Sequence, residues 1–417
     1  MSHGVHVEVE VKEDCPVSLT DIENWVRTLL RLEYPLLRDG PLELSAAAQK
    51  SSPYAAYTNT ITVSDVGFGS TISNVQADLM VHVFSLSETE PDKDFLDGEE
   101  EVHAVEQWEL PSKILTGLWN SIVVSPDIKE SLLGYCDTSL AFSDADIDPN
   151  IISWNRMALL YGPPGTGKTS LCKALAQKAY IRSIGIRYTS GVLLEINAHS
   201  LFSKWFSESG KLVMKMFEHI SDIAEDLDCF VCILIDEVES LTRSRSAASS
   251  GNEPGDAIRV VNAVLTALDN LRRQPNVLVL CTSNMIEGID AAFRDRLDLC
   301  IHVGEPGAQA RRLILRSCFV ELRNKGILVE EPGVPIDSCW SETGEVYNYE
   351  GREHPYLAKF EAIVARTEGL SGRALRKLAL RAHAQFIRKP TTDIWAFTDA
   401  VLSTLARDRD ETATVLL

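Results

Sequence analysis

A glycine-rich segment with a single lysine carries the clearest chemical signal in the chain. It spans residues 162–169 (GPPGTGKT), follows an apolar run at 157–161 and precedes a helical pattern. Glycines let backbone N–H groups turn inward around phosphate oxygens, and the positive end of the following helix faces the same anion. The pattern therefore predicts a loop that binds the phosphates of ATP. We assign to it Gly162, Pro163, Pro164, Gly165, Thr166, Gly167, Lys168, Thr169 and Ser170.

Two side chains of this loop have specific expected roles. Lys168 is expected to contact the β- and γ-phosphates, and the Thr169 hydroxyl is expected to ligate Mg²⁺. The alternative is a glycine-rich turn that binds no ligand. The strand expected before the loop, the lysine and the threonine together disfavour that alternative.

Two carboxylates follow a second apolar run. Residues 231–235 (VCILI) lead directly into Asp236 and Glu237. At a strand end beside the phosphate loop, Asp236 is expected to organise Mg²⁺ through water, and Glu237 to orient and deprotonate the attacking water. A base directed at water predicts a hydrolase, because a nucleoside kinase has no use for one. The alternative is an acidic pair that merely ends a strand.

Asn284 provides a third polar group at a strand end. It follows the apolar run at 277–281, in a strand expected to lie between the two strands that carry the phosphate loop and the carboxylates. Such an amide can position the lytic water from its other side and sense the γ-phosphate. A lone asparagine is more often a turn residue, but the two preceding elements favour the sensor.

Two arginine sites complete the candidate set. Arg296 is the first candidate and Arg294 the second for an arginine finger that serves a neighbouring subunit, since neither easily reaches its own nucleotide. Either arginine alternatively pairs with Asp295 or Asp298. Arg373 opens a helix in the sequence GLSGR and is expected to reach the γ-phosphate from a lid domain. The alternative for Arg373 is a surface arginine on a capped helix.

The elements that must position these residues follow an alternating strand and helix order. Between about residues 121 and 304, short apolar runs alternate with helical stretches such as 211–224. This order predicts an α/β fold, with a five-stranded parallel sheet covered by helices on both faces. The five expected strands are 157–161, 192–196, 230–235, 277–281 and 300–303.

A smaller domain is expected on each side of this P-loop module. Residues 1–120 combine alternating valines from Val5 onward with a helix signalled by a capping box at Thr20 and Glu23, which predicts a small α+β domain. Residues 305–417 are expected to form a helical lid. In the first domain, residues 71–86 contain a second strand-like pattern. In the lid, helices are expected at 308–322 and 371–388, with an inserted loop at 331–354.

Charge and composition limit the classes of partner. The formal net charge of −20 disfavours direct nucleic-acid binding and docking on an anionic membrane, because both need a basic surface. The first ten residues contain no apolar run long enough for a signal peptide or a membrane span. Cys229 and Cys232 form one isolated CxxC, which predicts small buried thiols in a reducing cytosolic or nuclear compartment.

The motifs in this order resemble the AAA+ family. Three further segments are similar to the pachytene checkpoint protein 2 homolog family: 154–156 (WNR), 201–212 (LFSKWFSESGKL) and 256–266 (DAIRVVNAVLT). The resemblance implies a hexameric ATPase that remodels HORMA-domain proteins by pulling a segment into a central pore. Members of that family act in the spindle checkpoint and on the meiotic chromosome axis, which implies a nuclear and cytoplasmic, chromosome-associated protein.

The resemblance also implies roles for residues that catalysis leaves out. Trp205 and Phe206, with Lys204 beside them, would be the aromatic grip of a first pore loop, and 247–255 a second pore loop. The first domain would recruit the substrate, often through an adaptor that is itself a HORMA protein. The polar setting of the aromatic pair also suits a grip by stacking on a threaded chain, although packing of Trp205 against a neighbouring helix is the alternative.

Two other functions fit parts of the pattern. A clamp-loader or DNA-motor relative is disfavoured by the negative charge and by the aromatic pair at 205–206. A scaffold whose assembly is gated by nucleotide is disfavoured by the complete set of Lys168, Asp236, Glu237 and Arg296, because a scaffold does not need the base Glu237.

Overall fold

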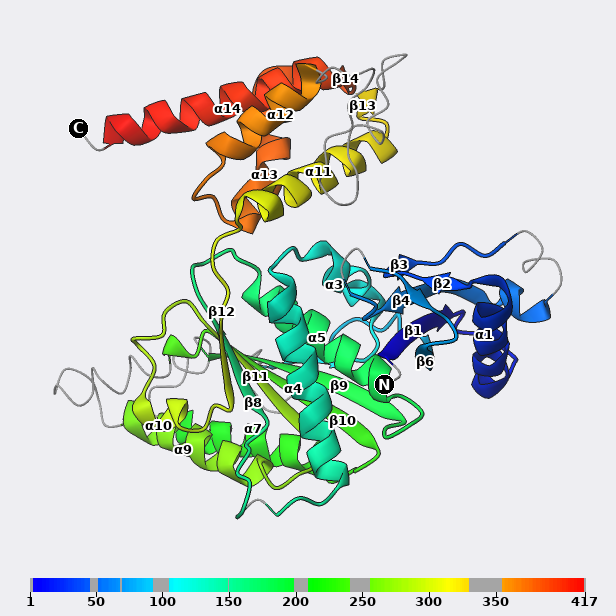
Figure 1. Cartoon of the computed structure of the whole chain (residues 1–417). Helices are drawn as coiled ribbons and strands as arrows, with labels where there is room; N and C mark the ends of the chain where they lie inside the picture. The colour runs from blue at the N-terminus through cyan, green and yellow to red at the C-terminus, as the bar shows by residue number, and fades with distance from the viewer. Residues whose placement is uncertain are drawn as a thin grey trace. The chain divides into compact units, whose positions relative to one another are not determined.

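The chain is described by a computed structural model (Figure 1). The structure describes residues 3–45, 52–67, 70–92, 105–148, 150–198, 209–240, 256–329 and 355–415. The chain divides into two compact units. The first comprises Met1–Ser121, Pro126–Tyr161 and Thr169–His302, and the second comprises Ile122–Ser125, Gly162–Lys168 and Val303–Leu417.

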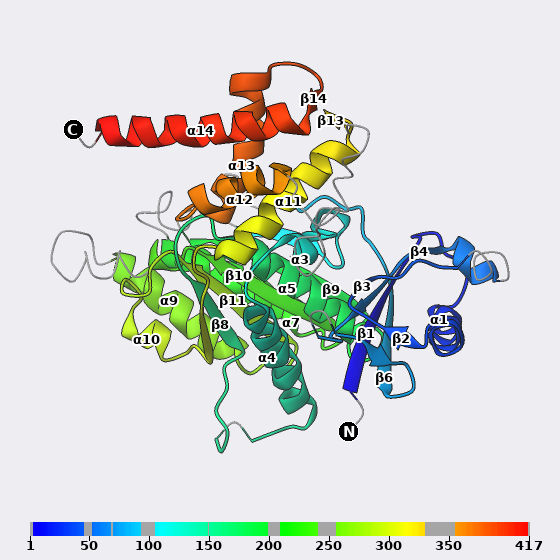
Figure 2. The same ribbon diagram turned by 45° about the horizontal axis from the view of Figure 1, so that its top comes forward.

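The N-terminal part of the first unit is a small α+β domain, as the sequence predicts. Its sheet has the order β3-β4-β1-β6, in which β1 pairs antiparallel with β4 and parallel with β6. The alternating valines of β1 are buried against α1, which lies along one face of this sheet (Figure 2). These elements are β1 (His3–Val11), α1 (Leu19–Glu33), β3 (Gly40–Pro41), β4 (Thr58–Ser64) and β6 (Ala77–Ser85).

The predicted capping box at the start of α1 is wrong. The helix begins at Leu19 with Ser18 as its N-cap residue, and no side chain caps it. Thr20 therefore lies inside the first turn. Glu23 pairs with Arg27 one turn further on, at 2.9 Å, which is the usual fate of opposite charges four residues apart.

The central sheet has six strands in the order β12-β8-β11-β10-β9-β7. The five predicted strands are all present and mutually parallel. The sixth, β7 (Val105–Glu109), pairs antiparallel with β9 at the edge and was not predicted. The five parallel strands are β8 (Met157–Tyr161), β9 (Ser190–Asn197), β10 (Cys229–Asp236), β11 (Val277–Ser283) and β12 (Leu299–His302).

Helices cover both faces of this sheet, as predicted. On one face, alternate residues of β10 such as Val231 and Ile233 join a core built with α7 (Ser209–Ala224) and α9 (Asp256–Leu271). On the opposite face, Tyr180 of α5 (Lys168–Ser183) stacks on Phe230, with ring centroids 6.1 Å apart. The helix α4 (Pro126–Asp144) lies beside α5 on that side (Figure 1). Burial on both faces explains why the strands are continuous apolar runs rather than alternating ones.

Two ion pairs join the small N-terminal sheet to α5 within the first unit. Lys178 of α5 contacts Glu8 of β1 at 2.5 Å, and both side chains are largely buried. One turn later, Arg182 contacts Asp65, which follows β4, also at 2.5 Å. Since a buried charge is costly without its partner, these pairs fix which face of the small sheet meets the helix that follows the phosphate loop.

The second unit is a helical lid with its own core. Phe319 packs edge-to-face against Phe360 and Phe397, with ring centroids 5.6 and 5.1 Å apart. A short parallel pair, β13 (Leu328–Val329) with β14 (Thr392–Asp393), lies among the helices. The helices are α11 (Ala308–Asn324), α12 (Pro355–Arg366), α13 (Gly372–Ala382) and α14 (Ile394–Val415).

One predicted lid helix is shorter than expected. The α-helical part of 371–388 ends at Ala382, and His383–Ile387 form a π-helical turn. The segment then stops at Arg388, which has a left-handed φ of 54°.

The remaining elements are short. Among the described residues, no helix combines the length and apolar character that crossing a bilayer requires. The short elements are β2 (Leu36–Leu37), the 3-10 turn Pro53–Ala56, β5 (Ile72–Ser73), the 3-10 turn Lys113–Leu115, α3 (Leu118–Ser121) and α10 (Ala291–Arg294).

Candidate active site

The predicted phosphate loop connects β8 to α5, so a helix N-terminus follows it directly. The Lys168 ammonium lies over the loop and donates hydrogen bonds to the carbonyl oxygens of Gly162, at 2.8 Å, and Pro163, at 2.9 Å. The Thr166 hydroxyl donates to the Pro163 carbonyl at 3.0 Å. Thr169 and Ser170 lie in the first turn of α5. The loop thus combines a buried cation with the positive end of a helix, which is the arrangement that binds phosphate.

Gly165 of the loop packs against the first turn of α13 within the second unit. The Arg373 backbone N–H donates to the Gly165 carbonyl at 3.0 Å. A Cβ atom on Gly165 would lie 2.8 Å from the Ser371 hydroxyl oxygen, and the φ of Gly165 is +79°. Both the backbone conformation and the space therefore require glycine. The contact places Arg373, the predicted lid sensor, next to the loop.

The strand-end residues of the first unit form one hydrogen-bonded cluster around Asp236. The Asp236 carboxylate accepts a hydrogen bond from the Thr169 hydroxyl at 2.9 Å and another from the Thr282 hydroxyl. Thr169 and Asp236 were the two predicted Mg²⁺ ligands. Magnesium takes oxygen ligands and usually keeps several waters beside one or two protein groups, so this hydroxyl and carboxylate fit it.

Glu237, the predicted base, has an unusual backbone conformation. Its φ is +58°, in the left-handed region that side chains other than glycine rarely adopt. Two contacts hold it there: the Glu237 N–H donates to the Thr282 hydroxyl at 3.2 Å, and the next N–H, of Val238, donates to the Thr282 carbonyl at 3.0 Å. The turn carries the chain away from the strand immediately after Asp236, with the Glu237 side chain half-buried. Thr282 is a site residue that the sequence prediction did not include.

Asn284, the predicted sensor, lies just past the end of β11, which runs between β8 and β10 as expected. Its backbone N–H and its side-chain amide both donate to Glu239, at 3.1 and 2.8 Å. Glu239 was also missed by the sequence prediction. The sequence carried no local signal for it, because its partner Asn284 lies 45 residues further along the chain.

Both candidate arginine fingers make hydrogen bonds within this chain. The Arg296 guanidinium forms a bidentate pair with Asp269 of α9, at 2.8 and 2.7 Å. This pair raises the pKa of Arg296 and lowers the pKa of Asp269. Arg294 donates to the carbonyl oxygens of Ile286 and Ile289, both at 3.1 Å.

The alternative pairing with Asp295 or Asp298 is wrong for both arginines. The carboxylate of Asp298 instead accepts from the Tyr135 hydroxyl and from the Asn155 backbone N–H, both at 2.8 Å. In the pair with Asp269, the Arg296 side chain is one-quarter exposed.

Several predicted residues lie outside the part of the chain that the structure describes. These are Lys204, Trp205 and Phe206 of the first expected pore loop, the second pore loop at 247–255 and the lid insertion at 331–354.

The isolated CxxC consists of buried thiols, as predicted. Cys229 and Cys232 are free cysteines on β10, and burial raises the pKa of both. Within the described ranges there is no cluster of three or more histidine, cysteine or acidic side chains that would hold a metal ion.

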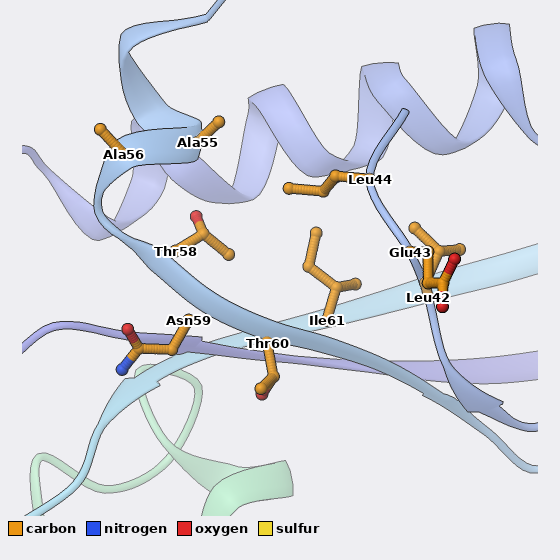
Figure 3. A pocket seen from close by; sticks show the side chains of 9 residues that line it. All are labelled: Leu42, Glu43, Leu44, Ala55, Ala56, Thr58, Asn59, Thr60 and Ile61. Atoms are coloured by element: carbon orange, nitrogen blue, oxygen red, sulfur yellow. The ribbon is translucent and has the colours of Figure 1, made fainter. Parts of the chain in front are cut away.

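A hollow of about 550 Å³ lies in the N-terminal domain, beside the edge of β4 (Figure 3). Its walls combine apolar side chains such as Leu42, Leu44 and Ile61 with the polar residues Thr58 and Asn59. None of the predicted catalytic or phosphate-binding residues line it. The hollow is therefore not part of the nucleotide site.

A phosphate loop before a helix, a parallel sheet ending in Asp-Glu, and a lid arginine beside the loop define the AAA+ class of ATPases. Three family models agree: the ATPase family associated with various cellular activities matches residues 158–305, the TRIP13 N-terminal domain matches 2–89, and the TRIP13-like AAA+ ATPase lid C-terminal domain matches 307–409. The chain is an ATP-hydrolysing enzyme.

Comparison with individual relatives identifies the family within the AAA+ class. The chain is 42% identical over 406 residues to the pachytene checkpoint protein 2 homolog of Xenopus tropicalis, covering 95% of this chain and 92% of that one. It therefore belongs to the pachytene checkpoint protein 2 (TRIP13) family of AAA+ ATPases. The solved structure of C. elegans PCH-2 is 30% identical and superimposes with a TM-score of 0.78, covering 98% of this chain and 100% of that chain.

A bacterial structure shares the fold at greater distance. It is described as the E. coli MS115-1 HORMA:CdnC:Trip13 complex, and the matching chain is 17% identical with a TM-score of 0.55. The match covers 76% of this chain and 97% of that chain.

Proposed function

We propose that this chain acts as a homohexamer that uses ATP hydrolysis to remodel HORMA-domain proteins, drawing a segment of the substrate into a central pore. Membership of the TRIP13 family supports the proposal, and so does the bacterial relative, which was solved in a complex with a HORMA protein. The observation that carries the hydrolytic part is the hydrogen-bonded cluster of Thr169, Asp236 and Thr282 next to Glu237.

The roles of the site residues follow from their chemistry. Lys168 and the loop N–H groups hold the phosphates, and Thr169 and Asp236 hold Mg²⁺. When bound, Mg²⁺ neutralises the charge on the phosphate oxygens. Glu237 takes a proton from the attacking water, and Asn284 orients that water. Arg373, in the lid, senses the γ-phosphate.

Arg296 is proposed to act on the nucleotide of a neighbouring subunit. A bidentate pair with Asp269 keeps its guanidinium at a defined position, while one-quarter of the side chain is exposed. Approach of a phosphate would offer the same planar cation a second bidentate partner. This arrangement supports Arg296 over Arg294, whose guanidinium is bonded only to carbonyl oxygens in the contacts described above.

The substrate-handling roles remain proposals that rest on the sequence and the family. Lys204, Trp205 and Phe206 would grip the threaded segment, and the N-terminal domain would recruit the substrate through a HORMA-type adaptor. The cellular role would be in the spindle checkpoint and in control of the meiotic chromosome axis. We place the protein in the nucleus and cytoplasm and on chromosomes, without direct membrane or nucleic-acid binding.

A substrate trap tests this function. The Glu237→Gln variant should bind ATP without turning it over, so it should retain its substrate in a pull-down made with ATP. We expect HORMA-domain proteins to be enriched on this variant relative to a matched Lys168→Ala control, which lacks the phosphate-binding ammonium. Equal recovery of HORMA-domain proteins by both variants, or their absence from both, would contradict the proposal.

A further inference from the structure

The buried carboxylate of Glu239 accepts hydrogen bonds from Asn284, the residue proposed to orient the water. Glu239 is only 5% exposed and lies at the start of the helical turn that follows Glu237. A single oxygen of Glu239, Oε1, accepts two hydrogen bonds from Asn284: one from the backbone N–H at 3.1 Å and one from the side-chain Nδ2 at 2.8 Å. The backbone N–H and the side-chain amide of Asn284 thus donate to the same oxygen atom.

This attachment determines which way the Asn284 amide faces. An ionised carboxylate only accepts hydrogen bonds, whereas an asparagine amide has a donating nitrogen and an accepting oxygen. If the amide were turned over, its Oδ1 would face the Glu239 carboxylate, and a charge-assisted hydrogen bond would become a repulsion between two acceptors. Glu239 therefore selects the orientation in which Nδ2 points at Glu239 and Oδ1 points away from it.

We propose that Glu239 is a positioning residue, which holds Asn284 so that its amide presents an accepting oxygen, and not a donating nitrogen, to the attacking water. This proposal rests on the role of Asn284 given above. A water molecule has two protons to place. One is transferred to the Glu237 carboxylate, and the other is hydrogen-bonded to Asn284 Oδ1.

The bonds that form and break during hydrolysis follow from that assignment of the two protons. With both protons held, a lone pair of the water oxygen points at the γ-phosphorus. The new O–P bond forms as the bond between the γ-phosphorus and the β–γ bridging oxygen breaks, and the bonding electrons leave with ADP. An Asn284 amide facing the other way would donate to the water and compete for the lone pair that must attack.

Glu239 is distinguished from a second base by its contacts. Its Oε1 already accepts hydrogen bonds from two N–H groups of Asn284, which leaves that oxygen poorly placed to take a proton from water. If Glu239 were a base, converting it to glutamine would abolish its function. A positioning residue would largely survive it, because a glutamine oxygen still accepts both hydrogen bonds.

A double-mutant cycle on the full chain tests the proposal, with steady-state ATPase rates and fluorescent-nucleotide binding as readouts. We expect Glu239→Ala and Asn284→Ala each to lower kcat by about 100-fold, with nucleotide affinity changed by less than about threefold. The double variant should be no slower than either single variant, because both remove the same interaction. Glu239→Gln should lose far less activity than Glu239→Ala.

Two further variants keep the test clear if the alanine variant folds poorly. Glu239→Asp keeps the charge but withdraws the acceptor by one methylene, so it should be slower than Glu239→Gln. Glu195→Ala is the matched control: Glu195 is a largely buried glutamate of β9 that pairs with Lys173 at 2.5 Å. It should lower the thermal unfolding midpoint without a comparable fall in kcat.

The possible failures are distinguishable. If Asn284→Ala hydrolyses ATP at the normal rate, the proposed role of Asn284 itself is wrong. If Asn284→Ala is slow but Glu239→Ala is not, or if the two losses multiply in the double variant, Glu239 does not act through Asn284. If Glu239→Gln is as slow as Glu239→Ala, the carboxylate acts through its charge and not by orienting the amide.

Discussion

Thr282 links Asp236, the proposed magnesium ligand, to Glu237, the proposed base. Its hydroxyl donates to Asp236 and accepts from the backbone N–H of Glu237, so one side chain supports both the predicted metal ligand and the left-handed turn at the base. A left-handed conformation at a residue other than glycine costs about 1–3 kcal/mol and persists only where neighbours hold it. The hydroxyl of Thr282 is one of those neighbours.

Replacing Thr282 with valine should slow hydrolysis while leaving the fold intact. Valine has nearly the same shape but no hydroxyl, so both hydrogen bonds are lost and Glu237 is less well placed. We expect kcat to fall by about tenfold or more in a steady-state ATPase assay. Thr282→Ser should retain most of the rate. Thr266→Val, on the exposed side of α9, is a matched control. Wild-type activity in Thr282→Val would show that the turn does not need this hydroxyl.

The candidate site residues that the sequence could predict are those that lie inside a motif or directly beside one. Asp236 and Glu237 follow directly on an apolar run, and Lys168 lies inside a recognisable loop. Glu239 and Asp269 were missed because their importance comes from a partner far along the chain: Asn284 is 45 residues from Glu239, and Arg296 is 27 residues from Asp269. Contacts of that kind depend on how β10, β11 and α9 pack, which no local pattern encodes.

At the scale of elements, the strands of the central sheet were predictable because they are buried on both faces and so consist of apolar runs. The edge strand β7 was not, since only Val105 and Trp108 of its five residues are buried and an acidic stretch precedes it. The end of α13 at Ala382 was also missed. The apolar periodicity continues beyond it through a π-helical turn, and periodicity alone does not separate the two kinds of helix.

The contact between the phosphate loop and α13 gives an element-scale prediction. Gly165→Ala should weaken nucleotide binding and lower the thermal unfolding midpoint, because it strains the backbone and moves the Ser371 hydroxyl. Gly185→Ala is a matched control, since Gly185 has a similar φ of +71° but open space around it. Gly185→Ala should carry only the conformational cost of about 1–2 kcal/mol. Equal effects of the two substitutions on stability and on nucleotide affinity would mean that the loop does not need close contact with α13.

At the scale of the whole first unit, two buried histidines make the small sheet sensitive to acid. His6 and His82 stack, with a hydrogen bond of 2.9 Å between Nδ1 of His6 and Nε2 of His82. Burial, and then the nearby Arg182 and Lys178 cations, lower the pKa of His6 to about 3. Burial, and then the neighbouring His6, do the same for His82. The acidic groups nearby include Glu8 and Asp65, which pair with those two cations, and Asp137, which lies 3.7 Å from Arg182.

The direction of the pH effect follows from these values. The unfolded chain binds protons on both histidines below about pH 6.5, whereas the folded chain does not until about pH 3. The free energy of unfolding should therefore have its full value above about pH 6.5 and decrease as the pH falls from 6.5 towards 3. At about pH 5 the decrease should be on the order of 1–2 kcal/mol per histidine. Thermal unfolding midpoints measured across that range provide the test. His82→Gln should flatten the dependence and the exposed His219→Gln should not; an unchanged slope in His82→Gln would contradict this account.

The central claim is that Glu237 is the base of an ATP-hydrolysing site, and one comparison tests it most directly. ATP affinity and turnover should be measured side by side for the wild-type chain and for Glu237→Gln. The amide keeps the size and the hydrogen-bonding capacity of the side chain but accepts no proton. We predict nucleotide affinity within about threefold of wild type and turnover reduced by at least about 100-fold. Turnover at the wild-type rate in Glu237→Gln would contradict the account, because the proton of the attacking water would then have another destination.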